Sequence, residues 1–196
     1  MFEKWAITLA NQIKKMNPEE TAPHDVLVFG FTILFNLVST IILLIVTGWL
    51  LGIFLITLQV GLSFMILRML SGGAHLDHSL ACSITSLIVI VACAWLPASP
   101  SMVYSYIVIS IVLVLRYAPY YEKHQMKHSL LWERKKKRAA IIWLALSLVI
   151  YEYFGQPGFV FGAFLQAGLL TPIGITFIHK LNAIVMKGGE GVEKIS

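Results

Sequence analysis

A histidine and a cysteine lie seven positions apart in a short polar break between two long apolar runs, in the stretch RMLSGGAHLDHSLACS at residues 68–83. Imidazole titrates near neutral pH, and a thiolate is a strong nucleophile towards carbonyl carbon, so His75 and Cys82 could serve as base and nucleophile in acyl transfer. On one straight helix they would share a face but stand roughly 10 Å apart along the axis, which is too far for a hydrogen bond. The pair therefore predicts a bend between His75 and Cys82.

The residues around the pair allow such a bend. Gly72 and Gly73 permit backbone conformations that are closed to other residues, and they predict the end of one helix and a sharp turn. Asp77 or Ser79 is a candidate N-cap, which would place Cys82 in or near the first turn of the next helix, where the helix dipole favours a thiolate. Asp77 is also a candidate for orienting the imidazole. The non-catalytic interpretation is a flexible loop at the two glycines, followed by Cys82 as a small residue of a membrane helix.

Other polar or reactive residues near the break have simpler interpretations. Arg68, at the membrane edge, either extends its guanidinium to the surface or binds a substrate carboxylate. His78 could replace His75 as the base in principle. Cys93 lies in mid-helix among apolar residues and is interpreted as packing, and a disulfide between Cys82 and Cys93 is not expected.

No metal or cofactor site is predicted. The candidate spacing is HQMKH, which places His124 and His128 four residues apart. A zincin needs a glutamate directly after the first histidine, and Gln125 stands there instead.

The elements that must position these side chains are membrane helices. Of the 196 residues, 58% are hydrophobic and 13% are charged, which is outside the range of ordinary soluble domains. A helix needs roughly 20 apolar residues to cross the hydrocarbon layer, and the chain supplies several runs of about that length. The predicted fold is an all-α polytopic membrane protein with about six transmembrane helices, at residues 26–47, 49–70, 79–96, 101–118, 139–154 and 158–179.

Two segments flank the single transmembrane domain predicted for residues 26–180. The first, residues 1–25, begins with apolar residues that recur at helical spacing opposite polar ones. It predicts an amphipathic helix that either lies in the membrane interface or packs on the rest of the protein. The second, residues 181–196, is expected to be a cytoplasmic tail.

The fifteen Lys and Arg residues orient the chain. With six helices, every basic segment falls on one side, and the positive-inside rule makes that side cytoplasmic. We therefore expect a multi-pass cell-membrane protein with both termini in the cytoplasm and the break at the cytoplasmic face. The basic stretch at 116–138, with Lys135, Lys136 and Lys137, is interpreted either as a topology signal that contacts lipid head groups or as a dock for an acidic peptide. Lipids and a peptide are the expected partners, and nucleic acid is not.

Arg68, Gly72, Gly73, His75 and Cys82 together resemble the signature of the accessory gene regulator protein B (AgrB) family. The length, the amphipathic start, the apolar runs and a Tyr-Ala-Pro ahead of a Lys/Arg-rich stretch are similar too. The resemblance therefore covers nearly the whole chain. The residues that follow Tyr-Ala-Pro differ from the Asn-Lys-Pro-like pattern of the family.

The resemblance implies a membrane cysteine endopeptidase of Gram-positive bacteria that processes the precursor of a cyclic autoinducing peptide for quorum sensing. His75 and Cys82 would take the catalytic roles. The substrate would be a short AgrD-like propeptide that enters from the cytoplasmic side, passes through an acyl-enzyme thioester and becomes a thiolactone. A homodimer is left open. The residues alone also leave open a small transporter or channel, and a non-catalytic peptide-binding membrane protein.

Overall fold

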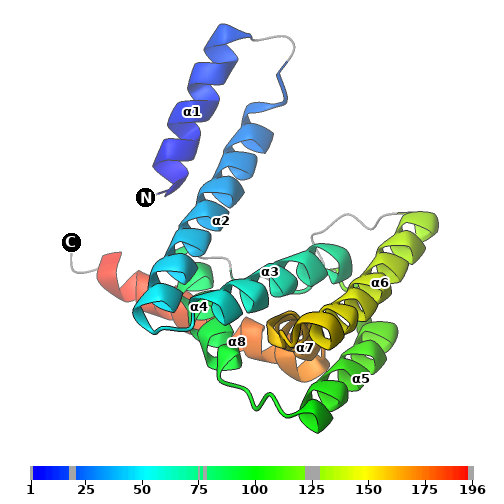
Figure 1. Cartoon of the computed structure of the whole chain (residues 1–196). Helices are drawn as coiled ribbons and strands as arrows, with labels where there is room; N and C mark the ends of the chain where they lie inside the picture. Colours follow the sequence, from blue (N-terminus) through cyan, green and yellow to red (C-terminus); the bar gives the residue numbers. More distant parts are fainter. Residues whose placement is uncertain (1, 18–20, 75, 77–78, 122–128, 194–196) are drawn as a thin grey trace. The chain divides into compact units, whose positions relative to one another are not determined.

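The computed structural model describes residues 2–17, 21–74, 76, 79–121 and 129–193. Within these residues the chain is helical and has no strand (Figure 1), so the predicted all-α class is confirmed. The helices are α1 (Phe2–Met16), α2 (His24–Leu50), α3 (Phe54–Ser71), α4 (Ser79–Ala94), α5 (Pro100–Tyr117), α6 (Leu130–Phe154), α7 (Gly158–Leu169) and α8 (Pro172–Glu193).

The chain divides into two compact units, Met1–Leu43 and Leu44–Ser196. In the first unit, the amphipathic pattern forms α1, which runs beside the part of α2 in the same unit (Figure 1). Ala6 and Ala10 are fully buried on one face of α1, whereas Trp5 remains 59% exposed. One face of α1 therefore packs inside its unit, and the Trp5 ring contacts Phe35 of the same unit with 6.3 Å between ring centres.

Three helices within the described residues, α2, α3 and α5, are long and apolar enough to cross a membrane. Together α7 and α8 would form a fourth span, but they are bent by 77° at the break between them. The predicted count of six spans is therefore not confirmed. The apolar part of α4 is short, and α6 begins at Leu130 with a run of basic residues instead of at residue 139.

The predicted sixth helix, 158–179, is two helices in the structure. Thr171 Oγ1 accepts a hydrogen bond from the N–H of Gly174 at 3.1 Å, which is an N-cap geometry, and Pro172 follows as the first helical residue. Proline has no N–H to donate back into a preceding turn, and its fixed φ suits a helix start. The cap and the proline together begin a new helix where hydropathy shows one continuous run.

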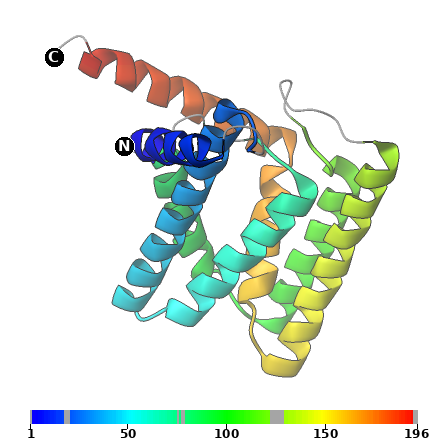
Figure 2. The ribbon, with the colours of Figure 1, turned by 90° about the horizontal axis from the view of Figure 1, so that it is seen from above.

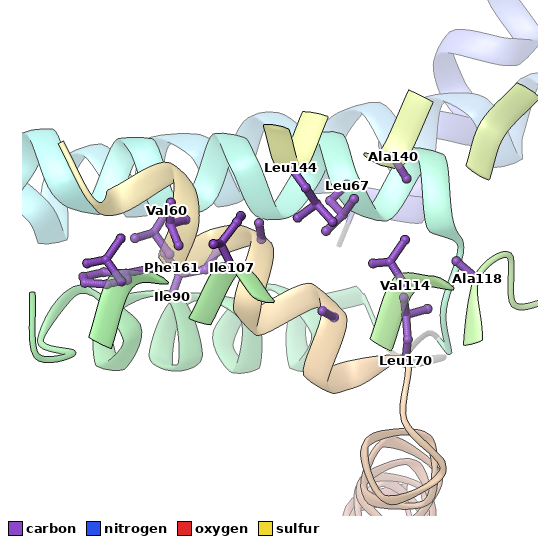
Figure 3. Packing of buried hydrophobic residues seen from close by; sticks show 14 of the residues in the cluster. Val60, Leu67, Ile90, Ile107, Val114, Ala118, Ala140, Leu144, Phe161 and Leu170 are labelled. Carbon is purple, nitrogen blue, oxygen red and sulfur yellow. The ribbon is translucent and has the colours of Figure 1, made fainter. Parts of the chain in front are cut away.

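In the second unit, α7 contacts α3, α5 and α6 (Figure 2). Val60 of α3, Ile107 of α5, Leu144 of α6 and Phe161 of α7 belong to one buried hydrophobic cluster (Figure 3). The approach of α7 to α3 is the closest, because a Cβ at Gly162 would lie only 2.2 Å from the Val60 carbonyl oxygen. Small residues at such contacts let backbones approach in a membrane, where helix packing depends on van der Waals contact.

Polar side chains join the same helices inside the apolar core. Ser63 Oγ of α3 donates to the Phe159 carbonyl oxygen at 2.6 Å and accepts from Trp143 Nε1 at 3.0 Å. Gln59 Nε2 donates to Gln156 Oε1 at 3.1 Å. Since a membrane offers few competing partners, the two bonds of Ser63 fix the rotation of α3 against α6 and α7.

Candidate functional site

The polar break begins where α3 ends. The last helical residue is Ser71, and the N–H of Gly72 donates to the Arg68 carbonyl oxygen at 2.9 Å. Gly72 has a φ of +72° and Gly73 a φ of +140°, conformations that L side chains rarely adopt. The predicted turn at the two glycines is confirmed.

The loop after α5 lies directly against this turn. The N–H of Tyr120 donates to the Ser71 carbonyl oxygen at 2.9 Å. A Cβ at Gly72 would lie 2.1 Å from the Tyr120 carbonyl oxygen, so no side chain fits there. The loop that contains the Tyr-Ala-Pro sequence therefore pairs with the glycine turn.

A buried glutamine on α7 holds the turn from the other direction. Gln166 Nε2 donates to Ser71 Oγ at 3.0 Å and to the Gly72 carbonyl oxygen at 2.8 Å, and the residue is fully buried. Gln166 Oε1 has no hydrogen-bond partner in the described part of the chain. A buried unpaired acceptor costs about 1–3 kcal/mol. The sequence interpretation missed this residue, although a hydrogen-bonding side chain inside an apolar helix is a recognised sign of function.

Arg68 reaches across the turn. Its Nη2 donates to the carbonyl oxygen of Ala74, and its guanidinium carbon lies 5.6 Å from the centre of the Phe64 ring. The guanidinium therefore holds the backbone of the break. Contact with the membrane surface and binding of a substrate carboxylate both stay predictions for Arg68.

Cys82 lies in the first turn of α4, which begins at Ser79. Leu76 is not helical, so the helix that holds Cys82 does not continue back through this position as one straight helix. A base and nucleophile pair at this spacing requires such a break. Cys82 is half-buried and lines a pocket of about 60 Å³ together with Arg68 and Ala74. The other lining residues are mostly apolar and come from the break and from α3, α4, α7 and α8: Leu76, Phe64, Thr85, Ser86, Val89, Leu165, Leu169, Phe177 and Ile178.

Three residues predicted around the pair, His75, Asp77 and His78, lie outside the described residues, as do His124 and His128. The described residues contain no group of three or more His, Cys, Asp and Glu that could hold a metal ion. The other cysteine, Cys93, is a free thiol that packs against the hydrophobic core, in line with the interpretation as packing.

The three lysines at the start of α6 differ in their surroundings. Lys137 Nζ donates to the carbonyl oxygen of Leu115 in the last turn of α5, where a helix dipole attracts positive charge. Lys136 Nζ lies 5.8 Å from the ring centre of Tyr121, and the Lys135 side chain is exposed. Lys137 thus donates a hydrogen bond to α5, whereas the exposed Lys135 has its Nζ 5.8 Å from the ring centre of Trp132 on its own helix.

The phenol beside Lys136 stays neutral. Burial raises the pKa of Tyr121 above its usual value, and the nearby carboxylate of Glu133 raises the pKa further. Lys136 therefore faces an uncharged aromatic ring at physiological pH, which is the geometry of a cation–π contact.

Comparisons with known proteins show what the chain is similar to. A family model described as accessory gene regulator B matches residues 3–179. The chain is 43% identical to an AgrB-like protein of Halalkalibacterium halodurans, over the full length of both. It is 31% identical to accessory gene regulator protein B of Staphylococcus aureus, over 63% of this chain and 69% of the relative. The same-named protein of Staphylococcus haemolyticus is 33% identical, over 61% and 67%. No solved structure matches the chain.

Proposed function

The chain belongs to the accessory gene regulator B family, and on that premise we propose that it is a membrane cysteine endopeptidase of quorum sensing. It removes the C-terminal segment of a short AgrD-like propeptide and promotes closure of a thiolactone ring. Cys82 is the nucleophile and His75 the base. The observation that carries the proposal is the pocket at the break, where the first turn of α4 places the Cys82 thiol beside Arg68 and the backbone that leads to His75.

The proposed reaction begins with acylation. His75 takes the proton from Cys82 Sγ, and the sulfur attacks the scissile carbonyl carbon of the propeptide. The first backbone N–H groups of α4 have no acceptor within the helix, so they are the natural donors to the oxyanion. Collapse of the tetrahedral intermediate breaks the C–N bond, and His75 gives its proton to the departing amine. The N-terminal part of the propeptide remains on Cys82 as a thioester.

Ring closure follows by thioester exchange. A cysteine thiol of the propeptide gives up its proton and attacks the thioester carbonyl carbon. The C–S bond to Cys82 breaks as the thiolactone forms, and the proton goes to Cys82 Sγ. The apolar walls of the small pocket support this route, because they restrict water that would otherwise hydrolyse the thioester. Forming a thioester from an amide is uphill, so removal of the released segment or export of the ring must draw the reaction forward.

Trapping the thioester tests the proposed function. The probe is a candidate propeptide, a short peptide with a central cysteine and an acidic tail, whose cysteine is replaced by alanine so that the ring cannot close. With purified protein in proteoliposomes, we expect release of the C-terminal segment and a gain in protein mass equal to the N-terminal part less one water. Hydroxylamine should remove the adduct, because it cleaves thioesters.

Mass spectrometry of peptide fragments should place this adduct on Cys82, with the Cys93 fragment unmodified as the internal control. Release of the C-terminal segment without any adduct would contradict a thioester that persists long enough for ring closure. No release from the propeptide that keeps its cysteine would refute the endopeptidase.

The exposed basic start of α6 is proposed to bind the acidic C-terminal part of the propeptide. Lys135→Gln should weaken propeptide binding by about threefold at low salt, as expected for an exposed charge pair, and the difference should vanish near 1 M salt, where the Debye length is about 3 Å. The measurement is a titration of labelled propeptide into proteoliposomes at several salt concentrations.

Lys137→Gln is the matched control in the same turn, because Lys137 already donates to the Leu115 carbonyl oxygen. We expect it to lower thermal stability without changing the salt dependence of binding. Equal, salt-independent effects of the two substitutions would contradict a docking role for Lys135.

A further inference from the structure

We infer that Gln166 is a positioning residue for the proposed reaction, because its carboxamide fixes the turn from which the chain runs to His75. This inference rests on the proposed function and deepens it. Gln166 does not line the Cys82 pocket, so it is not a catalytic residue. It acts through the backbone of the break.

The carboxamide nitrogen of Gln166 donates two hydrogen bonds to the end of α3. An amide NH₂ has two donors, and Gln166 Nε2 has two acceptors, Ser71 Oγ at 3.0 Å and the Gly72 carbonyl oxygen at 2.8 Å. One side chain thus holds two consecutive residues at the point where α3 ends. Inside a membrane protein, where water does not compete, such a bond orients its partners strongly.

The next two residues of the break are held as well. A Cβ at Gly73 would lie 3.4 Å from Gln166 Nε2 and 3.5 Å from Arg68 Nη1, so both side chains flank this glycine. Arg68 then donates to the carbonyl oxygen of Ala74. The backbone from Gly72 to Ala74 is therefore held by one side chain from α7 and one from α3, and the next residue in the sequence is His75.

The turn does not need Gln166 in order to end α3. Ser71 Oγ donates to the Leu67 carbonyl oxygen at 2.7 Å, and the N–H of Gly72 donates to the Arg68 carbonyl oxygen. Both bonds lie within α3 and its cap. The bonds of Gln166 add something different, since they tie the turn to α7, which also supplies Leu165 and Leu169 to the wall of the Cys82 pocket. The helix α7 therefore contacts both the turn and the pocket.

A second buried glutamine provides a matched control. Gln59 is 8% exposed, donates from Nε2 to Gln156 Oε1 at 3.1 Å and, like Gln166, has an Oε1 without a hydrogen-bond partner in the described part of the chain. It precedes Ser71 by twelve residues, which is roughly 18 Å along α3. Its chemistry and burial match those of Gln166, but its bond lies far from the break.

The experiment compares Gln166→Leu and Gln59→Leu in a Cys93→Ala background, so that Cys82 is the only thiol. Two quantities are measured in proteoliposomes: kcat and KM for propeptide cleavage, and the rate of Cys82 alkylation by iodoacetamide at neutral pH. For Gln166→Leu we expect kcat to fall by about 10- to 100-fold with KM unchanged, since a small misplacement of a reacting group costs that much. Alkylation should slow by about fivefold, because the base no longer assists the thiol. Gln59→Leu should change neither quantity.

Equal kcat values for Gln166→Leu and the parent protein would overturn the inference, and so would an equal loss in Gln59→Leu. If the parent protein does not cleave the propeptide, the proposed function fails and the alkylation rates decide the inference separately: slower alkylation in Gln166→Leu alone supports it, and equal rates overturn it. Should Gln166→Leu not fold, Gln166→Asn replaces it. The shorter amide cannot reach both acceptors, so the same loss of kcat is expected, and a parental kcat would overturn the inference.

Discussion

Replacing Cys82 with alanine is expected to abolish cleavage of the propeptide, with kcat reduced by about 10³-fold or more. The reason is chemical, because the substitution removes the atom that attacks the scissile carbonyl and becomes acylated. The side chain is half-buried at the start of α4, and its loss leaves only a small addition to the existing pocket. Folding and propeptide binding should therefore survive, and mass spectrometry of the propeptide after incubation measures the effect.

Cys93→Ala is the control for this substitution. The residue lies eleven positions farther along α4, roughly 16 Å along the axis, and packs against the core. Its replacement should leave kcat within about twofold of the parent value, as for a small packing change. Cleavage that survives Cys82→Ala would remove Cys82 from the mechanism, and a loss of cleavage in Cys93→Ala would show that the assay responds to folding rather than to chemistry.

Replacing Gly72 with alanine should be the most damaging change to the turn itself. Gly72 has φ +72° and ψ −156°, a region that is essentially closed to other residues, so a side chain there costs about 1–3 kcal/mol in strain. The added Cβ would also lie 2.1 Å from the Tyr120 carbonyl oxygen. That oxygen cannot simply move aside, because the N–H of the same residue donates to the Ser71 carbonyl oxygen. We expect a loss of about 2–6 kcal/mol in the free energy of unfolding, the sum of strain and overpacking.

Gly155→Ala is the control for a positive φ without a steric clash. Gly155 has φ +65° and ψ +18°, in the left-handed region, and an added Cβ there meets nothing within 4 Å. It should cost only the strain of that region, about 1–2 kcal/mol. Unfolding in detergent measures both variants. Cleavage should drop by about 10²-fold for Gly72→Ala, because the turn that leads to His75 is displaced, and not for Gly155→Ala. Equal losses of stability in the two variants would mean that Tyr120 does not constrain the turn.

The features that the sequence could predict are those set by local chemistry. The helical class follows from long apolar runs, because a chain in lipid must satisfy its backbone hydrogen bonds internally. The end of α3 follows from Gly72 and Gly73, because glycine adopts the positive-φ conformations that turn the chain there. The bend before Cys82 follows from the rise of a helix, because seven residues on one straight helix would separate the base and the nucleophile by roughly 10 Å. Each of these depends on neighbours in sequence, and the structure agrees with each.

The number of spans and the role of single residues were harder to predict. A hydropathy run from 158 to 179 looks continuous, but Thr171 and Pro172 begin a new helix, and a cap is invisible to an average over many residues. The three lysines at 135–137 form one motif in sequence. In the structure, one of them donates to the end of α5 and another is exposed. Residues that form one basic motif in the sequence therefore have different surroundings in the structure.

The sequence by itself therefore determined the helical membrane character, the glycine turn and the placement of Cys82 at a helix start. Only the tertiary structure decided what holds the turn. Gln166 is 95 positions away from Ser71 in the chain, and the carbonyl oxygen of Tyr120 is 48 positions from Gly72. Contacts of this kind depend on which helix faces which, and in a membrane that choice rests on close backbone approach at small residues such as Gly162. Mean hydropathy carries no record of that choice, since an average over a helix does not show which neighbour its few polar residues, such as Ser63 and Gln166, will face.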